Sequence, residues 1–215
     1  KIKTQEITSV SVVSQFLKQI TAYNQDINAI SDLRDIDDIL KEAAEKDRET
    51  ANGTPLGLLH GLPVTVKDTY HVKGLISSNG NPQLKSNVAD TDAELVRRIK
   101  NAGAIIIGKS NLALYAFDWQ STNDWFGQTN NPYNLNHVVG GSSGGSAAAL
   151  AAGFTPLELG TDAGGSIRVP AHFCGICGLR TTESALPLRG NMLTPNSLRI
   201  GRYLTSNGPM AKNVA

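Results

Sequence analysis

The spacing of apolar side chains predicts two amphipathic helices near the start of the chain. Apolar residues recur at helical intervals over residues 8–23, and the positions between them carry Ser, Gln and Lys. A second set with the same period covers residues 35–47. Glycine and proline at residues 53–57 interrupt this pattern. We therefore expect residues 1–54 to form a helical N-terminal region.

Two short apolar runs further along predict strands of a sheet. Residues 62–66 read Leu-Pro-Val-Thr-Val, and Lys67 follows at the carboxyl end of this strand. Residues 104–107 form an uninterrupted apolar run of the kind that is buried on both faces of a sheet. Between the two strands, Thr91 and Glu94 have the spacing of a helix capping box. A helix followed directly by a buried strand favours an α/β domain.

Glycine and serine gather in two later loops. The first covers residues 140–145, reads Gly-Gly-Ser-Ser-Gly-Gly, and leads into an alanine-rich helix over residues 146–152. The second covers residues 160–168 and reads Gly-Thr-Asp-Ala-Gly-Gly-Ser-Ile-Arg. Backbone N–H groups that converge beside a serine can stabilise an oxyanion, and glycine allows such close approach. The loops therefore offer candidate serine nucleophiles, and Lys67 is a candidate base if burial keeps it neutral.

The composition excludes several classes of protein. The chain has 215 residues, which is enough for one large domain with a buried core. Its 20 basic residues balance 19 acidic ones without any basic run, so we expect no binding to nucleic acid or to an anionic membrane. No apolar stretch is long enough to cross a bilayer, and no basic-then-apolar leader is visible, which favours a cytoplasmic protein.

Three motifs match known sites but lack the context that those sites need. Residues 103–110 fit the P-loop pattern, but the residues between its glycines should form a strand and not a phosphate-binding loop. Residues 140–144 fit the nucleophile elbow, although the sequence before them is turn-like. Cys174 and Cys177 have the spacing of a redox pair or of half a zinc site, but the motif does not open a recognisable helix after a strand, and no second ligand pair accompanies it. We therefore expect two buried small residues there, no metal and no cofactor.

The order of the motifs resembles the amidase signature family, which includes fatty-acid amide hydrolase and the A subunit of glutamyl-tRNA amidotransferase. The segments that carry the resemblance are residues 61–68, 102–111, 140–148, 160–171, 173–179 and 208–211. The resemblance as a whole covers roughly residues 55–215, which we take as the amidase signature core of a single domain. The family fold is α/β, with a mixed central sheet covered by helices. Because family members are longer, the resemblance implies that sequence after Ala215 completes the sheet and the substrate pocket.

The resemblance also implies a Ser–Ser–Lys triad. Ser166 would be the nucleophile, Ser142 the bridging serine held on a cis peptide, and Lys67 the base. Substrate contacts are implied for Gly140 and Gly141. The oxyanion hole would be formed by four backbone N–H groups, those of Ala163, Gly164, Gly165 and Ser166.

The implied reaction is hydrolysis of the C–N bond of a small-molecule amide through an acyl-enzyme on Ser166. We expect Asp162 and Arg168 to hold the second loop rather than to react. Residues 117–126 contain both tryptophans and lie either near the pocket or in the core.

Alternatives to a stand-alone amidase stay open. The A subunit of the amidotransferase, which liberates ammonia from Gln or Asn, typically carries Gln directly after Ser-Ile-Arg, whereas this chain has Val169, which favours the amidase. Two alternatives from other classes are a P-loop-type nucleotide binder and a catalytically silent binding subunit. A homodimer is compatible with all of these functions.

Overall fold

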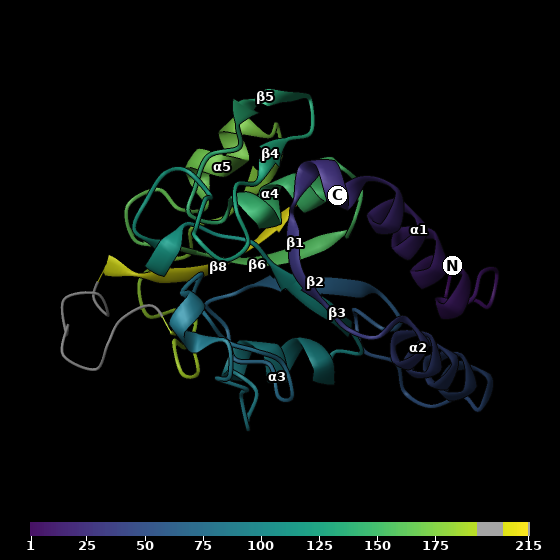
Figure 1. Cartoon of the computed structure of the whole chain (residues 1–215). Coiled ribbons are helices and arrows are strands. Elements are labelled where there is room, and N and C mark those ends of the chain that lie inside the picture. The colour runs from purple at the N-terminus through teal and green to yellow at the C-terminus, as the bar shows by residue number, and fades with distance from the viewer. Residues whose placement is uncertain (193–203, 215) are drawn as a thin grey trace.

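The computed structural model describes residues 1–192 and 204–214 (Figure 1) and confirms the expected α/β class. The helices are α1 (Ser9–Ile27), α2 (Ile36–Ala51), α3 (Glu94–Asn101), α4 (Gly144–Ala151) and α5 (Arg168–Phe173), with the 3-10 turns η1 (Pro82–Leu84) and η2 (Leu114–Ala116). The strands are β1 (Ile30–Leu33), β2 (Pro63–Lys67), β3 (Ile105–Ser110), β4 (Asn130–Asn131), β5 (Asn134–Val138), β6 (Leu157–Asp162), β7 (Cys177–Gly178) and β8 (Ser206–Ala211).

A mixed sheet runs through the described part of the chain in the order β1-β3-β2-β6-β8-β7. β3, β2 and β6 are parallel neighbours, whereas β1, β8 and β7 are each antiparallel to the strand beside them. Because β2 and β6 are parallel, their carboxyl ends lie on the same side of the sheet. Lys67 ends β2 and Asp162 ends β6, so both residues lie on that side. In open α/β sheets, ligands bind outside the carboxyl ends of the strands.

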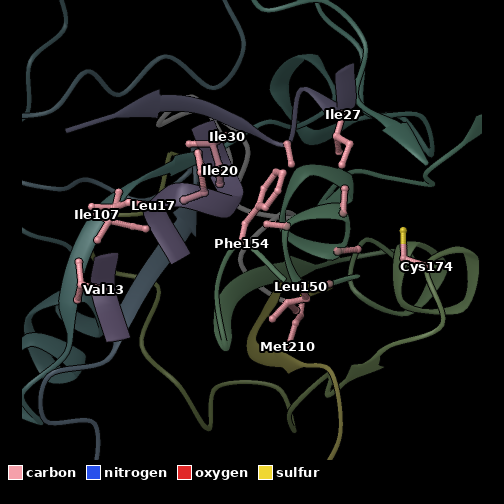
Figure 2. Close-up of a cluster of buried hydrophobic side chains, with 14 of the residues drawn as sticks. Val13, Leu17, Ile20, Ile27, Ile30, Ile107, Leu150, Phe154, Cys174 and Met210 are labelled. Carbon is pink, nitrogen blue, oxygen red and sulfur yellow. The ribbon is translucent and has the colours of Figure 1, made fainter. Parts of the chain in front are cut away.

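Alternate residues of β3 bury opposite faces of the sheet. Ile105 and Ile107 belong to a core shared with α1, α2 and α4, whereas Ile106 belongs to a second core shared with β2 and α3. Figure 2 shows the first core, where Leu150 of α4 lies beside Met210 of β8. α3 covers the opposite side of the sheet from α4 (Figure 1). The apolar run at residues 104–107 therefore forms a strand buried on both faces, as predicted.

The N-terminal region contains both predicted helices and one strand that the sequence did not reveal. α1 follows Thr8, whose side chain accepts a hydrogen bond from the N–H of Ser11, and α2 follows Asp35. The expectation that residues 1–54 are helical omits β1, which pairs with β3 at the edge of the sheet. A strand of four residues is too short for its alternation to be recognised.

The helix predicted around residues 94–102 is α3, but its predicted capping box is wrong. α3 begins after Ala93, which has no side-chain cap, and Thr91 lies outside the helix. The Glu94 carboxylate instead accepts hydrogen bonds from three arginines, Arg97, Arg98 and Arg189. Arg97 above all, and then Arg98, lower the pKa of Glu94 to about 2. This carboxylate is therefore engaged by cations rather than by the backbone of the first turn.

The three discounted motifs lie in different settings, and two of the expectations about them are wrong. β3 covers most of the P-loop-like segment, and the buried Nζ of Lys109 lies 2.7 Å from Asp68 Oδ1 rather than in a phosphate-binding loop. The elbow-like loop follows β5, so the turn-like character expected before it is wrong for residues 134–138, although β5 pairs with β4 and not with the mixed sheet. Cys174 is buried, but Cys177 is exposed, so the prediction of two buried cysteines is wrong for Cys177.

The described residues contain neither a side-chain cluster suited to a metal ion nor a helix suited to crossing a membrane. Across residues 1–192 and 204–214, no cluster of three or more His, Cys, Asp or Glu side chains has the arrangement of a metal site. None of the helices in these ranges combines the length and the apolar character that a bilayer crossing requires.

Candidate active site

Lys67 ends β2 at the carboxyl edge of the sheet and is fully buried. Its Nζ lies 2.6 Å from Ser142 Oγ and 2.9 Å from Thr161 Oγ1. Burial lowers the pKa of Lys67 from 10.5 to about 7, although the negative charge of Asp162 opposes part of this shift. A large fraction of Lys67 is therefore neutral near pH 7, and a neutral amine can accept a proton from a hydroxyl group.

Ser142 lies in the first glycine- and serine-rich loop, just before α4. The peptide bond between Gly141 and Ser142 is cis, as the resemblance implied. The Ser121 hydroxyl holds this loop, because it lies 3.1 Å from the Gly140 carbonyl oxygen and accepts a 2.8 Å hydrogen bond from the N–H of Gly144. The loop thereby keeps the Ser142 side chain against the buried lysine.

Gly140 and Gly141 allow the first loop to pack closely against neighbouring backbone. A Cβ atom on Gly140 would lie 2.9 Å from Pro170 Cα, and one on Gly141 would lie 2.7 Å from the carbonyl oxygen of Asp118. Gly140 also has a φ of +78°, which favours glycine. Their contact with substrate stays a prediction, and the contacts seen here are with the protein itself.

Asp162, the last residue of β6, holds the second loop. Its carboxylate accepts hydrogen bonds from the N–H groups of Gly165 at 2.8 Å and Ile167 at 3.0 Å, and two from the Arg168 guanidinium at 2.9 and 3.0 Å. Burial by itself would raise the pKa of Asp162, but Arg168 and the backbone N–H groups lower it to about 2. The contacts of Asp162 and Arg168 agree with the expected loop-holding role. Residues 160–162 belong to β6, so the loop begins later than predicted.

Ser166 lies in the turn between β6 and α5, next to the first loop. The N–H of Ser143 donates a 3.1 Å hydrogen bond to the carbonyl oxygen of Ser166, which joins the two loops through their backbones. Ser166 is 8% exposed, whereas Lys67, Ser142 and Ser143 have no exposed surface. Among the residues that the structure describes, the Ser166 hydroxyl has no hydrogen-bond partner. Its proximity to Ser142 therefore rests on the backbone link and not on a direct bond between the hydroxyl groups.

The backbone around Ser166 narrows the set of candidate oxyanion donors. The N–H of Gly165 donates to Asp162, so the structure disagrees with its predicted place in the oxyanion hole. The N–H groups of Ala163, Gly164 and Ser166 make no hydrogen bond to any residue of the described ranges. Three uncommitted N–H groups therefore remain in the loop that carries the Ser166 hydroxyl.

The sequence did not predict two contacts of the site, those of Thr161 and Ser121, and it left the position of Trp119 open. Thr161 and Ser121 were not singled out, because a hydroxyl residue in a strand or loop has no pattern that marks its partner. Trp119 is 63% exposed, and its Nε1–H donates a 3.1 Å hydrogen bond to the carbonyl oxygen of Gly164. Trp119 therefore lies beside the second loop, whereas Trp125 stacks on the ring of its neighbour Phe126.

A sequence model of the family described as Amidase matches residues 11–215, which is nearly the whole chain. The chain belongs to the amidase signature family. Because the match begins inside α1, the family resemblance extends beyond residues 55–215 and includes the N-terminal helices.

Individual members of the amidase signature family show how far the similarity reaches. The chain is 41% identical over 199 residues to the A subunit of the glutamyl-tRNA(Gln) amidotransferase of Alkaliphilus metalliredigens, a match that covers 92% of this chain and 40% of the relative. It is 36% identical over 215 residues to indoleacetamide hydrolase of Bradyrhizobium diazoefficiens, a match that covers 100% of this chain and 41% of the relative. The chain thus spans about two fifths of the length of these curated relatives.

Solved amidase structures have the same fold over this chain. The structure matches that of a peptide amidase from Stenotrophomonas maltophilia with a TM-score of 0.89 and 34% identity, over 99% of this chain and 44% of that one. It matches a bacterial aryl acylamidase of the amidase signature family with a TM-score of 0.90 and 31% identity, over 99% of this chain and 43% of that one.

Proposed function

We propose that the protein is a serine amidase that hydrolyses the C–N bond of a small-molecule carboxamide through an acyl-enzyme on Ser166. The pair formed by Lys67 and Ser142 carries this proposal. A buried lysine with a pKa of about 7 lies 2.6 Å from a buried hydroxyl group, in a loop whose backbone is bonded to Ser166. Ser166 keeps some exposed surface, whereas Lys67 and Ser142 have none, and the nucleophile is the residue of the three that must contact substrate.

In the proposed reaction, Ser166 Oγ attacks the amide carbonyl carbon while its proton passes to Ser142 and the Ser142 proton passes to neutral Lys67. The carbonyl electron pair moves to oxygen, where the N–H groups of Ala163, Gly164 and Ser166 stabilise it. A donor in a comparable site contributes about 3–4 kcal/mol to the transition state. The proton returns to the leaving nitrogen as the C–N bond breaks. Water then attacks the acyl-enzyme, releases the carboxylic acid and restores the serine hydroxyl.

Substitution and labelling test these roles directly. Ser166→Ala should abolish turnover of model amides and Lys67→Ala should nearly abolish it, while circular dichroism shows that both proteins still fold. An organofluorophosphonate should modify Ser166 and leave the buried Ser143 unmodified, as read by peptide mass spectrometry. Ser86→Ala, which removes an exposed serine hydroxyl, is the matched control. Turnover at the control rate by either site variant would refute the assignment, and a wild-type protein that is not labelled would support a silent binding subunit.

An amidotransferase subunit is the second candidate, because the relative that is 41% identical carries that name. Such a subunit would use the same serine to liberate ammonia from glutamine or asparagine. Val169, in place of the Gln typical of those subunits, favours the amidase. Glutamine hydrolysis that clearly exceeds hydrolysis of simple carboxamides would support the amidotransferase instead. The homodimer and the cytoplasmic location stay predictions, which light scattering and cell fractionation test.

A further inference from the structure

Glu158, the second residue of β6, is a fully buried carboxyl group that the proposed reaction does not use. Within residues 1–192 and 204–214, its hydrogen-bond partners are all hydroxyl groups. Thr155 Oγ1 donates to Oε1 at 2.8 Å, Thr65 Oγ1 also donates to Oε1, and Ser110 Oγ donates to Oε2 at 3.2 Å. Burial raises the pKa of Glu158 to about 7, and the hydroxyl groups oppose part of this shift. Because an unpaired carboxyl group is costly to bury, the elements that it connects are informative.

Two of these partners flank Lys67 within the sheet. Thr65 is the cross-strand partner of Glu158 in the parallel β2–β6 ladder, and it precedes Lys67 by two residues on the same face of β2. Ser110 is the cross-strand partner of Lys67 itself in the β2–β3 ladder. Glu158 therefore forms hydrogen bonds to Thr65, which lies two residues before Lys67, and to Ser110, which lies beside Lys67 on β3.

The same network reaches the helix that follows Ser142. Ser110 Oγ lies 2.7 Å from Ser146 Oγ in the first turn of α4. Ser146 is fully buried and follows Ser142 by four residues, which is about one helical turn. One carboxyl group thus connects the strand that carries Lys67 to the helix that is continuous with the Ser142 loop.

We infer that Glu158 is a positioning residue, whose carboxyl group fixes β2, β3 and α4 relative to one another so that Lys67 Nζ stays against Ser142 Oγ. It makes no hydrogen bond to Lys67, Ser142 or Ser166 and acts on them through the hydroxyl groups of Thr65, Ser110 and Ser146. The inference rests on the proposed function, because Glu158 would position Lys67, the proposed base, against Ser142, the proposed bridging serine.

Two substitutions of Glu158 separate position from charge. Glu158→Leu removes every hydrogen bond of this side chain and keeps a similar volume, whereas Glu158→Gln keeps the shape and one acceptor oxygen. The rate at which an organofluorophosphonate modifies Ser166 should fall by about tenfold or more in Glu158→Leu. In Glu158→Gln it should stay within about threefold of wild type. Thr50→Val is the matched control, because it removes a buried hydroxyl group from α2 and should keep the wild-type rate.

A second measurement follows Lys67 without requiring catalysis. Carbon-13 NMR of the lysine ε-carbons reports its titration, and a loosened site that admits water should raise the pKa of Lys67 from about 7 toward 10.5 in Glu158→Leu but not in Glu158→Gln. If Glu158→Leu does not fold, Ser146→Ala replaces it, because this variant cuts the link to α4 and leaves the carboxyl group in place.

The outcomes distinguish this inference from the proposed function. Modification of Ser166 at the wild-type rate in Glu158→Leu overturns the positioning role, and so does a Glu158→Gln variant as slow as Glu158→Leu. Absence of labelling in the wild-type protein overturns the proposed function instead. In that case the Lys67 titration decides the positioning role alone, and an unchanged titration in Glu158→Leu overturns it.

Discussion

Replacing Lys67 by Met should change how the stability of the protein depends on pH. The folded state favours the neutral amine, because the pKa of Lys67 falls from 10.5 to about 7 on burial. Between these two values the unfolded chain binds more protons than the folded protein, so stability rises with pH. The slope is about 1.4 kcal/mol per pH unit for one group, and the full shift corresponds to about 5 kcal/mol. Lys67→Met removes this dependence.

Urea denaturation at pH 7.0 and pH 9.5 measures the effect. The free energy of unfolding of wild type minus that of Lys67→Met should increase by about 3 kcal/mol between these two pH values. Glu158, whose pKa is raised to about 7, changes stability with the opposite sign and at lower pH, between about 4.5 and 7, so it does not mask the result. Lys18→Met, at an exposed position of α1, is the control. A wild-type minus Lys67→Met difference that stays constant with pH would refute the neutral-lysine reasoning.

Two further predictions concern the loops around the site. Gly141→Ala should destabilise the protein by about 1–3 kcal/mol in urea denaturation, because its Cβ atom would lie 2.7 Å from the carbonyl oxygen of Asp118, whereas Gly164→Ala has open space and should change stability by less than about 0.5 kcal/mol. Equal effects of the two substitutions would contradict the packing argument. Trp119→Phe removes the hydrogen bond to Gly164 and should slow labelling of Ser166 by no more than about tenfold, and a complete loss of labelling would show that the indole has a larger task.

The elements that the sequence predicted are those with a long or uninterrupted pattern. α1 and α2 carry apolar residues over several turns, and the apolar runs at residues 62–66 and 104–107 became β2 and β3. The proximity of Lys67 to Ser142 and the cis peptide before Ser142 followed from the family resemblance, not from periodicity. These features depend on local pattern or on a recognised motif, so they can be read along the chain.

The features that the sequence did not predict depend on partners that are distant in the chain. Thr91 and Glu94 have capping-box spacing, but Arg189, which is far away in the sequence, is one of the groups that engage Glu94. Likewise, the four N–H groups proposed for the oxyanion hole look equivalent until the Asp162 carboxylate is placed against one of them, that of Gly165. Spacing along the chain shows which groups are available, and only the tertiary fold shows which of them are already bonded.

The segment from Lys67 to Ser166 contains every side chain that the proposed chemistry uses, and the neighbouring strands β2 and β6 frame it. Differences in sequence outside this segment therefore leave the side chains of the proposed chemistry unchanged. Relatives of more than twice this length are named for a tRNA-linked reaction and for indoleacetamide. The reacting groups of the proposed chemistry therefore lie in a part of the chain that relatives named for different reactions share.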